Sequence, residues 1–266
     1  MLKLNTESNG SLLQQIQQKQ NNLMEKLASG KRINSAADGA AAQQIIDRLS
    51  SQVEGNRQAI SNAYDGISLA QVAEGGLKGI NDDVSRIREL SLQAGNGILS
   101  DSDRRAIQSE ITQLQDNISQ TIEQTNFAGK PLLTQDGSID FQVGANAGQK
   151  NSIGTQDVSA GLNGILNIDV TSQGGAEQAL QAADAAQEFV GSARADLGAT
   201  QNAFESTARN LAQTDVNVAA ARSRIQDTDY AQVTSENIQA GIQNQASIAV
   251  QTQANQQRGQ VLSLLG

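Results

Sequence analysis

Apolar residues recur at the three- and four-residue steps of an α-helix along most of this chain. The clearest pattern is a heptad seam between residues 176 and 225, in which a row of larger apolar side chains alternates with a row of small ones. The first row is Ala176, Ala183, Val190, Leu197, Phe204, Leu211, Val218 and Ile225, and the second is Ala179, Ala186, Ala193, Thr200, Thr207, Thr214 and Ala221. This spacing predicts a coiled-coil helix about 75 Å long, which needs partner helices along its whole length.

The N-terminal half contains two further helical segments that are suitable partners. Apolar residues keep the same spacing over residues 46–94, and the Gly-Asn-Gly sequence that follows predicts a helix end. Ser100 then offers an N-cap for a second helix, which buries apolar residues as far as Ile122. We expect these two helices to form an antiparallel hairpin, and the 176–225 helix to pack against it as the third member.

Residues 129–175 separate these helices and differ from them in composition. They contain the only proline of the chain and two short segments of alternating apolar and polar residues, 139–143 and 165–170. Alternation of this kind predicts strands with one buried face, so we expect a small β-hairpin. The predicted fold class is mainly α: a long antiparallel helical bundle or coiled coil with a small β-hairpin insert.

The two ends of the chain carry narrow apolar stripes in glutamine-rich surroundings, within residues 11–28 and 230–265. The members are Leu13, Ile16, Leu23 and Leu27 at one end, and Ile238, Ile242, Val250, Val261, Leu262, Leu264 and Leu265 at the other. Each such side chain left in water forgoes about 1.5–3 kcal/mol of burial free energy. The stripes therefore predict self-assembly with neighbouring copies of the chain. The alternative is that the two stripes pair with each other within one chain.

The composition removes most kinds of chemical site. The chain of 266 residues has no His and no Cys, which excludes the commonest metal ligand and general base, disulfides and thiolate sites. Its net charge of −9 argues against nucleic acid as a partner, and no stretch has the apolar length of a membrane span. The N-terminus lacks the apolar core of a secretory signal peptide. We predict a structural protein with no catalytic, metal or cofactor site, which neither binds nucleic acid nor inserts into a membrane.

Several motifs, taken together, resemble those of bacterial flagellin. The segment LASGKRINSAADGAA at 27–41 is similar to the flagellin signature L-S-S-G-x-R-I-N-S-A-x-D-D-A-A, although Gly39 stands in place of its second Asp. Then follow NAYDGISLAQ at 62–71, RIREL at 86–90, NFAGKPLL at 126–133, FQVGANAG at 141–148, SRIQDTD at 223–229, QANQ at 253–256 and VLSLL at 261–265. The resemblance covers essentially the whole chain, which looks like a short flagellin without large outer domains.

The resemblance implies an inner and an outer domain. Residues 1–33 and 230–266 would pair as the inner coiled-coil domain, and residues 34–43 and 221–229 would be connecting spokes. Residues 44–220 would form the outer rod, with 129–175 as its β-hairpin region. The family's function implies a subunit that polymerises into the flagellar filament for swimming motility. It would be exported unfolded by the flagellar type III route and located in the extracellular flagellum.

The resemblance also implies partners. Other copies of the chain would be the main one, and a flagellar export chaperone would bind the C-terminal helix. The filament cap and the hook-associated proteins would be further partners. In the first spoke, Arg32, Asn34 and Asp38 would make polar contacts between subunits, with simple exposure as the alternative.

Three further residues match the positions at which many flagellins are bound by the innate immune flagellin receptor: Arg86, Leu90 and Glu110. The alternative is that Leu90 packs against neighbouring helices, while Arg86 and Glu110 are solvated charges.

Two other functions fit parts of the pattern. A hook–filament junction protein has similar terminal helices, but the spoke and mid-chain motifs favour flagellin. A soluble coiled-coil binding or chaperone module would need no apolar C-terminal tail and would stay monomeric or dimeric. Regrowth of filaments from heat-released monomers on filament seeds separates flagellin from such a module.

Overall fold

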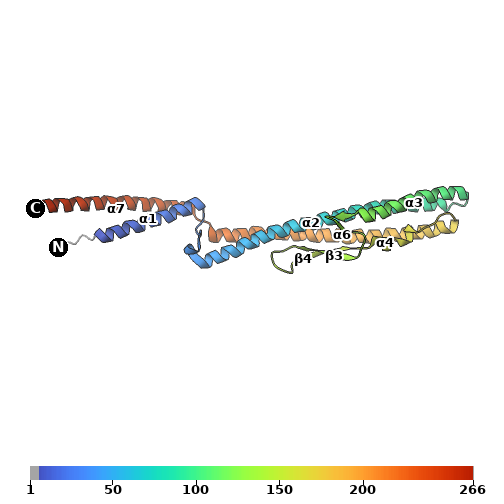
Figure 1. The fold of residues 1–266 in the computed structure, drawn as a ribbon, viewed down its shortest axis with the longest axis horizontal. Coiled ribbons are helices and arrows are strands. Elements are labelled where there is room, and N and C mark those ends of the chain that lie inside the picture. The colour runs from blue at the N-terminus through green and yellow to red at the C-terminus, as the bar shows by residue number, and fades with distance from the viewer. Residues whose placement is uncertain (1–5, 266) are drawn as a thin grey trace. The chain divides into compact units, whose positions relative to one another are not determined.

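The structure of the protein is a computed structural model that describes residues 6–265, with side chains described for residues 10–257, 259 and 260. Its long helices are α1 (Thr6–Ser29), α2 (Ala36–Ala94), α3 (Asp101–Gln124), α6 (Gln173–Gln226) and α7 (Tyr230–Leu265). The short elements between α3 and α6 are β1 (Asn126–Phe127), β2 (Lys130–Pro131), β3 (Gly137–Gln142), β4 (Lys150–Thr155), α4 (Val158–Gly161) and α5 (Asn163–Leu166) (Figure 1). The predicted mainly-α fold is confirmed, and each long helical segment expected from the spacing is present.

The chain divides into two compact units. One unit is the segment 54–215, and the other combines the terminal segments up to Val53 and from Val216 onward. We call them the central unit and the terminal unit. Their boundary cuts through α2 and α6, whereas the sequence predicted an outer rod spanning residues 44–220. Much of both predicted spokes is helical, because α2 begins at Ala36 and α6 ends at Gln226.

In the central unit, α2 and α3 form the antiparallel hairpin that the sequence predicts. The buried guanidinium of Arg104 closes the turn by donating hydrogen bonds to the carbonyl oxygens of Ala94 (2.7 Å) and Asn96 (3.2 Å). Ser100 is the N-cap of α3 and forms a capping box with Asp103. The backbone groups that a helix terminus leaves unpaired thus find partners at both sides of the turn.

Helices α2, α3 and α6 lie side by side in the central unit and share one core (Figure 1). The larger row of the predicted α6 seam is buried from Ala176 to Phe204 and half-buried from Leu211 onward. Phe204 meets the ring of Phe141 edge-on, with the ring centroids 5.5 Å apart. It lies directly against Gly66 of α2, where an added Cβ would be 2.6 Å from its ring. The core is thus built on close approach of helices, which the small residues permit.

The insert contains the expected β-hairpin, but only its first strand is where the sequence predicted it. β3 pairs antiparallel with β4, so that Ile139 lies opposite Ile153. The second strand predicted, 165–170, is wrong. Its first residues belong to α5, and the rest is not a strand. β4 escaped prediction because Ile153 is the only large apolar residue in it.

Glutamine side chains of α3 take the place of a neighbouring strand for the segment 165–170. The Gln115 amide donates to the carbonyl oxygen of Ile165 (2.9 Å). The Gln108 amide donates to the carbonyl oxygen of Ile168 (3.3 Å) and accepts from the backbone N–H of Val170 (2.7 Å). These bonds satisfy backbone groups that would otherwise require a β-ladder.

A second, smaller hairpin follows α3. β1 and β2 pair antiparallel, with Phe127 opposite Lys130, and only Ala128 and Gly129 connect them. Both connecting residues have positive φ angles, 50° for Ala128 and 79° for Gly129. This is the backbone pattern of the type I′ turn, which matches the twist of a two-residue hairpin.

Candidate assembly interface

Helices α1 and α7 pack along each other in the terminal unit (Figure 1). Leu23 is buried against Val233 and Ala240, and Leu27 packs against the same cluster. The two earlier members of the N-terminal stripe precede them at heptad spacing and are half-buried: Leu13 and Ile16. The stripe of α1 therefore lies on the side that faces α7 of the same chain, and its contacts with other copies of the chain stay a prediction.

The face of α7 that meets α1 is mostly small and polar. At alternating three- and four-residue steps it presents Val233, Asn237, Ala240, Asn244, Ser247, Gln251 and Ala254, all buried or half-buried. The side-chain amide of Asn237 donates to the sulfur of Met24 (3.8 Å), and that of Asn244 donates to Gln20 Oε1 (3.3 Å). The Oδ1 atoms of both asparagines are buried and accept no hydrogen bond from a described residue. A buried unpaired acceptor costs about 1–3 kcal/mol, so this seam holds α7 weakly.

The apolar residues of α7 lie on its other side. Ile238, Ile242 and Val250 are 59%, 63% and 60% exposed. Ala246 and Ala249 lie beside them and are exposed as well. We call these five residues the apolar face of α7. Because a helix turns once in about 3.6 residues, Ile238 and Ile242 point away from the seam that contains Val233 and Ala240.

In the middle of α7 this face borders a shallow hollow of about 230 Å³ between the two terminal helices. Leu12 of α1 and the Ala246, Ser247 and Val250 side chains of α7 line it. The hollow widens the apolar surface to both helices. The side chains of Val261, Leu262, Leu264 and Leu265 lie outside the described residues, so their role in assembly stays a prediction.

The first spoke is fastened to the end of α6 within the chain. The backbone N–H of Arg32 donates to the carbonyl oxygen of Gln226 (2.6 Å), and its guanidinium donates to that of Ile225 (2.8 Å). Lys31 forms a β-bridge with Asp227. Arg32 thus holds two segments of its own chain together, and its polar contacts with another subunit stay a prediction.

Asn34 and Asp38 also have partners within the chain. The carboxylate of Asp38 accepts hydrogen bonds from the backbone N–H groups of Asn34 and Ser35, both at 3.0 Å. The bond from Asn34 is the main cause, and that from Ser35 the second, of a pKa of Asp38 below its usual value. The Asn34 side chain donates to Glu25 (2.7 Å). Asp38 therefore closes a turn before α2, although its exposed carboxylate remains accessible.

The three residues matched to receptor contacts fall into two groups. Leu90 is 2% exposed and belongs to the core of the central unit, so it holds α2 to its neighbours instead of offering surface. Arg86 and Glu110 are exposed, and the guanidinium donates two hydrogen bonds to Glu110 Oε1 (2.8 and 3.2 Å) and one to Glu89 (3.0 Å). The bond to Glu110 is the main cause of a raised pKa of Arg86.

Sequence reasoning missed one residue that ties the terminal helices together. The hydroxyl of Tyr230 donates to the carbonyl oxygen of Leu27 (3.1 Å), and its ring lies against Gly30. Gly30 has a φ of 68°. A tyrosine one helical turn before a buried valine has no distinctive spacing, so no pattern in the sequence indicated this contact.

Among the described residues, no group of three or more acidic, His or Cys side chains is placed to hold a metal ion. Within residues 6–265, no helix has the apolar length required to cross a membrane.

Comparisons with known proteins point to one family. Residues 2–138 match the bacterial flagellin N-terminal helical region, and residues 180–265 match the bacterial flagellin C-terminal helical region. The chain is 39% identical to a flagellin of Bacillus subtilis strain 168, with 91% of each chain covered. It is 40% identical to a flagellin of Halalkalibacterium halodurans, over 91% of this chain and 90% of the relative. The crystal structure of Bacillus cereus flagellin is similar with a TM-score of 0.53 and 26% identity, over 61% of this chain and 94% of that one.

Proposed function

The chain belongs to the bacterial flagellin family and is a structural subunit of the flagellar filament, and from this membership we propose that the apolar face of α7 carries its polymerisation. Flagellins are structural proteins, so the chain is not an enzyme. The family self-assembles into an extracellular filament. The observation that carries the proposal is the exposure of Ile238, Ile242 and Val250 on the side of α7 that α1 leaves uncovered.

Burial of this face against a second copy supplies the driving force in our proposal. Each large aliphatic side chain gains about 1.5–3 kcal/mol when it is fully buried. This gain offsets the entropy lost when terminal helices held by a weak seam become ordered. The surfaces that meet are different patches of the chain, so the contact repeats without closing and builds a helical polymer.

The proposal extends to location and export. We expect the subunit to pass unfolded through the flagellar type III route and to reside in the extracellular filament. An export chaperone would cover the apolar face of α7 before export, because the same exposed side chains promote premature association. Filament cap and hook-associated proteins would contact the terminal helices at the two ends of the polymer.

The test is a substitution of two exposed isoleucines, Ile238→Ser with Ile242→Ser. Purified chains are heated to monomers, cooled and seeded with filament fragments, and polymer is measured by sedimentation and electron microscopy. Because both side chains are exposed in the single chain, the variant keeps its helices by circular dichroism. We expect the lowest concentration that polymerises to rise at least about tenfold.

The matched control replaces two exposed polar residues of the same helix, Gln239→Ser with Gln243→Ser. This pair lowers helix propensity at least as much, because serine ranks with isoleucine and below glutamine. It removes no apolar surface, and it should polymerise like the unchanged chain. Polymerisation of the isoleucine variant at the control's concentration would contradict the proposed role of this face.

For the innate immune receptor we propose a contact through Arg86 and Glu110 alone, since Leu90 is buried. The supporting feature is an exposed ion pair at the surface of the α2–α3 hairpin. Arg86→Ala should weaken receptor activation by monomers, whereas Arg105→Ala on the same hairpin should not. Equal receptor activation by both variants would contradict the proposed contact with the receptor.

A further inference from the structure

Ile98 is an unusually exposed apolar side chain. It lies in the turn between α2 and α3, and it is 88% exposed, more than any other described large apolar residue. The adjacent Leu99 is half-buried and packs against the core of the central unit. The turn therefore anchors Leu99 in the core and leaves the side chain of Ile98 exposed to solvent.

The turn that presents Ile98 is fixed on both sides. The buried Arg104 donates hydrogen bonds to two backbone carbonyl oxygens of the turn, those of Ala94 and Asn96. The Asn96 side chain accepts a hydrogen bond from the backbone N–H of Ile98 (3.3 Å). Ser100 and Asp103 close its other end through the capping box. The exposure of Ile98 thus belongs to a well-bonded turn, and the side chain forms a preset knob.

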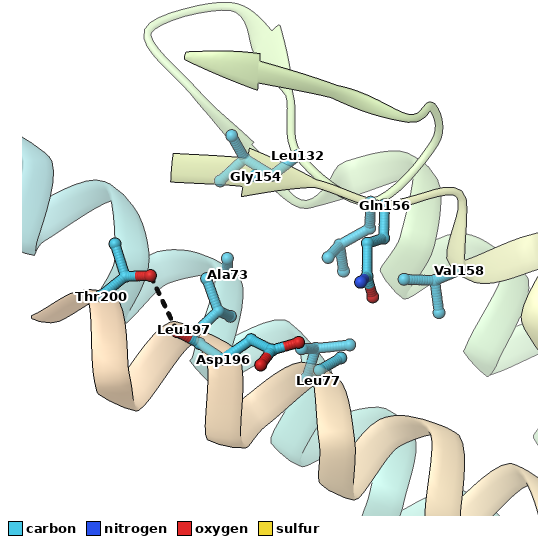
Figure 2. A pocket seen from close by; sticks show the side chains of 11 residues that line it. Ala73, Leu77, Leu132, Gly154, Gln156, Val158, Asp196, Leu197 and Thr200 are labelled. Atoms are coloured by element: carbon cyan, nitrogen blue, oxygen red, sulfur yellow. Dashed lines mark hydrogen bonds between the residues drawn. The ribbon is translucent and has the colours of Figure 1, made fainter. Parts of the chain in front are cut away.

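A hollow of matching size and polarity lies elsewhere on the central unit. It has a volume of about 130 Å³ and opens between β4 and the helices α2 and α6 (Figure 2). Its apolar walls include Leu77, Leu133, Val158 and Leu197, which are all buried and hence already in place. An aliphatic cavity of about 150 Å³ accommodates a benzene-sized group, so this hollow has room for one branched side chain.

The turn that carries Ile98 and the hollow are each accompanied by one charged side chain without an ion pair among the described residues. The two charges are opposite. Asp196 lies at the rim of the hollow beside Gln156 (Figure 2). Arg105 follows the turn in the first part of α3, and its Nε donates only to the backbone carbonyl oxygen of Asp101. Of the acids near Arg105, Asp103 is engaged by Ser100. A guanidinium without an ion pair thus follows the turn that carries Ile98, and a carboxylate without an ion pair borders the hollow.

We propose that Ile98 of one copy inserts into this hollow of a second copy, with Arg105 beside Asp196 of the hollow. Ile98 cannot fill the hollow of its own chain, because Leu77 and the end of α2 are about 25 Å apart along the helix. Knob and hollow are different patches, so the contact passes from copy to copy without closing. The inference rests on the proposed function and adds a contact made by the central unit to the one made by α7.

The chain contains no Cys, which makes disulfide trapping a direct test. Ile98→Cys and Gln156→Cys are prepared as separate chains, mixed in equal amounts with an excess of unchanged chain, polymerised on seeds and oxidised. We expect covalent dimers on non-reducing gels from filaments of this mixture, and none from the same mixture kept as monomers. A matched mixture of Ser119→Cys with Gln156→Cys, in which Ser119 is exposed in the C-terminal part of α3, should give none.

A second variant adds a side chain at Gly154, on the border of the hollow. Gly154 borders the hollow, and a Cβ added there meets no atom within 4 Å, so Gly154→Leu should fold normally and cover the opening. We expect this variant and Ile98→Ser each to raise the lowest polymerising concentration about tenfold, and the double variant to raise it no further. Gly191→Leu, at an equally open position of α6, serves as the control.

The outcomes separate this inference from the proposed function. Filaments of normal appearance without the 98–156 dimer, or normal polymerisation of Gly154→Leu, would overturn the knob-and-hollow contact and leave the role of α7 untouched. Failure of the unchanged chain to polymerise on seeds would overturn both.

Discussion

Ala128 occupies a backbone conformation that its side chain disfavours. With a φ of 50° it is the only non-glycine residue with a positive φ in the described chain, and it stands first in the type I′ turn before Gly129. A left-handed conformation costs an L-residue about 1–2 kcal/mol, whereas asparagine tolerates it and Asn-Gly is the favoured pair for this turn. We expect Ala128→Asn to raise the free energy of unfolding in urea by about 1 kcal/mol. Ala128→Val should lower it, and a stabilised valine variant would contradict this explanation.

The carboxylate of Asp38 makes the turn before α2 sensitive to acid. Its pKa in the folded chain is lowered by the backbone N–H groups of Asn34 and Ser35, relative to about 3.9 in the unfolded chain. Because the folded pKa is the lower one, the stabilisation is complete well above the unfolded value of about 3.9 and is lost as pH falls through the folded value. NMR titration of the Asp38 carboxyl carbon should give a midpoint below 3.9. In Asp38→Asn the amide shifts of Asn34 and Ser35 should no longer follow pH in this range.

At the residue scale, sequence spacing indicates burial well and partners poorly. The burial of Leu90 follows from the three- and four-residue steps of α2, which the sequence displays. The polar seam of α7 does not, because Asn237 and Asn244 carry no apolar signal and the more hydrophobic face of the helix is the one left exposed. Hydrophobic spacing identifies the face that will be buried, but cannot tell whether the same chain or another copy will cover it.

At the element scale, the glycines of α2 have opposite consequences. Gly66 lets Phe204 approach the helix, and a Cβ there would be 2.6 Å from the ring, whereas Gly79 faces open space. We expect Gly66→Ala to lower the free energy of unfolding by about 1–3 kcal/mol through overpacking. Gly79→Ala should raise it by about 0.5–1 kcal/mol through better helix propensity. Urea unfolding of the two variants compares them directly, and destabilisation of similar size in both would show that packing at Phe204 is not the cause.

The asparagines between α1 and α7 weaken the packing of these two helices. Because the Oδ1 atoms of Asn237 and Asn244 are buried without a partner, replacing both side chains by Leu removes a desolvation cost from the seam. We expect the double variant to slow amide exchange in α1 and α7 of the monomer, equivalent to about 1 kcal/mol for each site. Exchange measured by mass spectrometry in α3 should stay unchanged. Faster exchange in α7 would mean that the asparagines stabilise the pair.

The existence of the long helices is the best predicted feature of this chain, whereas the start of α2 at Ala36 lies inside a predicted spoke. Long periodic segments, Gly after Ala94 and the Ser100 cap fix α2, α3 and α6 with little ambiguity. The insert is harder, since its strands are short and β4 has one large apolar residue. The alternation at 165–170 was misleading because glutamine side chains of α3, and not a second strand, form hydrogen bonds with this backbone. The sequence near 165–170 contains no signal for such bonds.

At the scale of the whole molecule, the two units differ in the quality of their cores. The central unit buries large side chains from three helices, whereas the cluster between α1 and α7 consists of Leu23, Val233 and Ala240 with Leu27 beside it. We expect amides of α1 and α7 in the monomer to exchange on the order of a hundredfold faster than those of α3. On polymerisation this difference should shrink, as measured by hydrogen exchange of filaments and monomers. Terminal helices already protected like α3 in the monomer would contradict a weak terminal unit.

Each unit contains one tyrosine, and the chain has no tryptophan. Tyr64 is exposed on α2 in the central unit, while Tyr230 in the terminal unit is tied by its hydroxyl to Leu27. The ultraviolet emission of this protein therefore comes from two chromophores, one for each unit. Tyr230→Phe leaves a chain whose fluorescence follows the central unit alone, and subtracting its signal from that of the unchanged chain isolates the terminal helices. The protein thus carries its own optical reporter of the terminal unit, free of any attached dye.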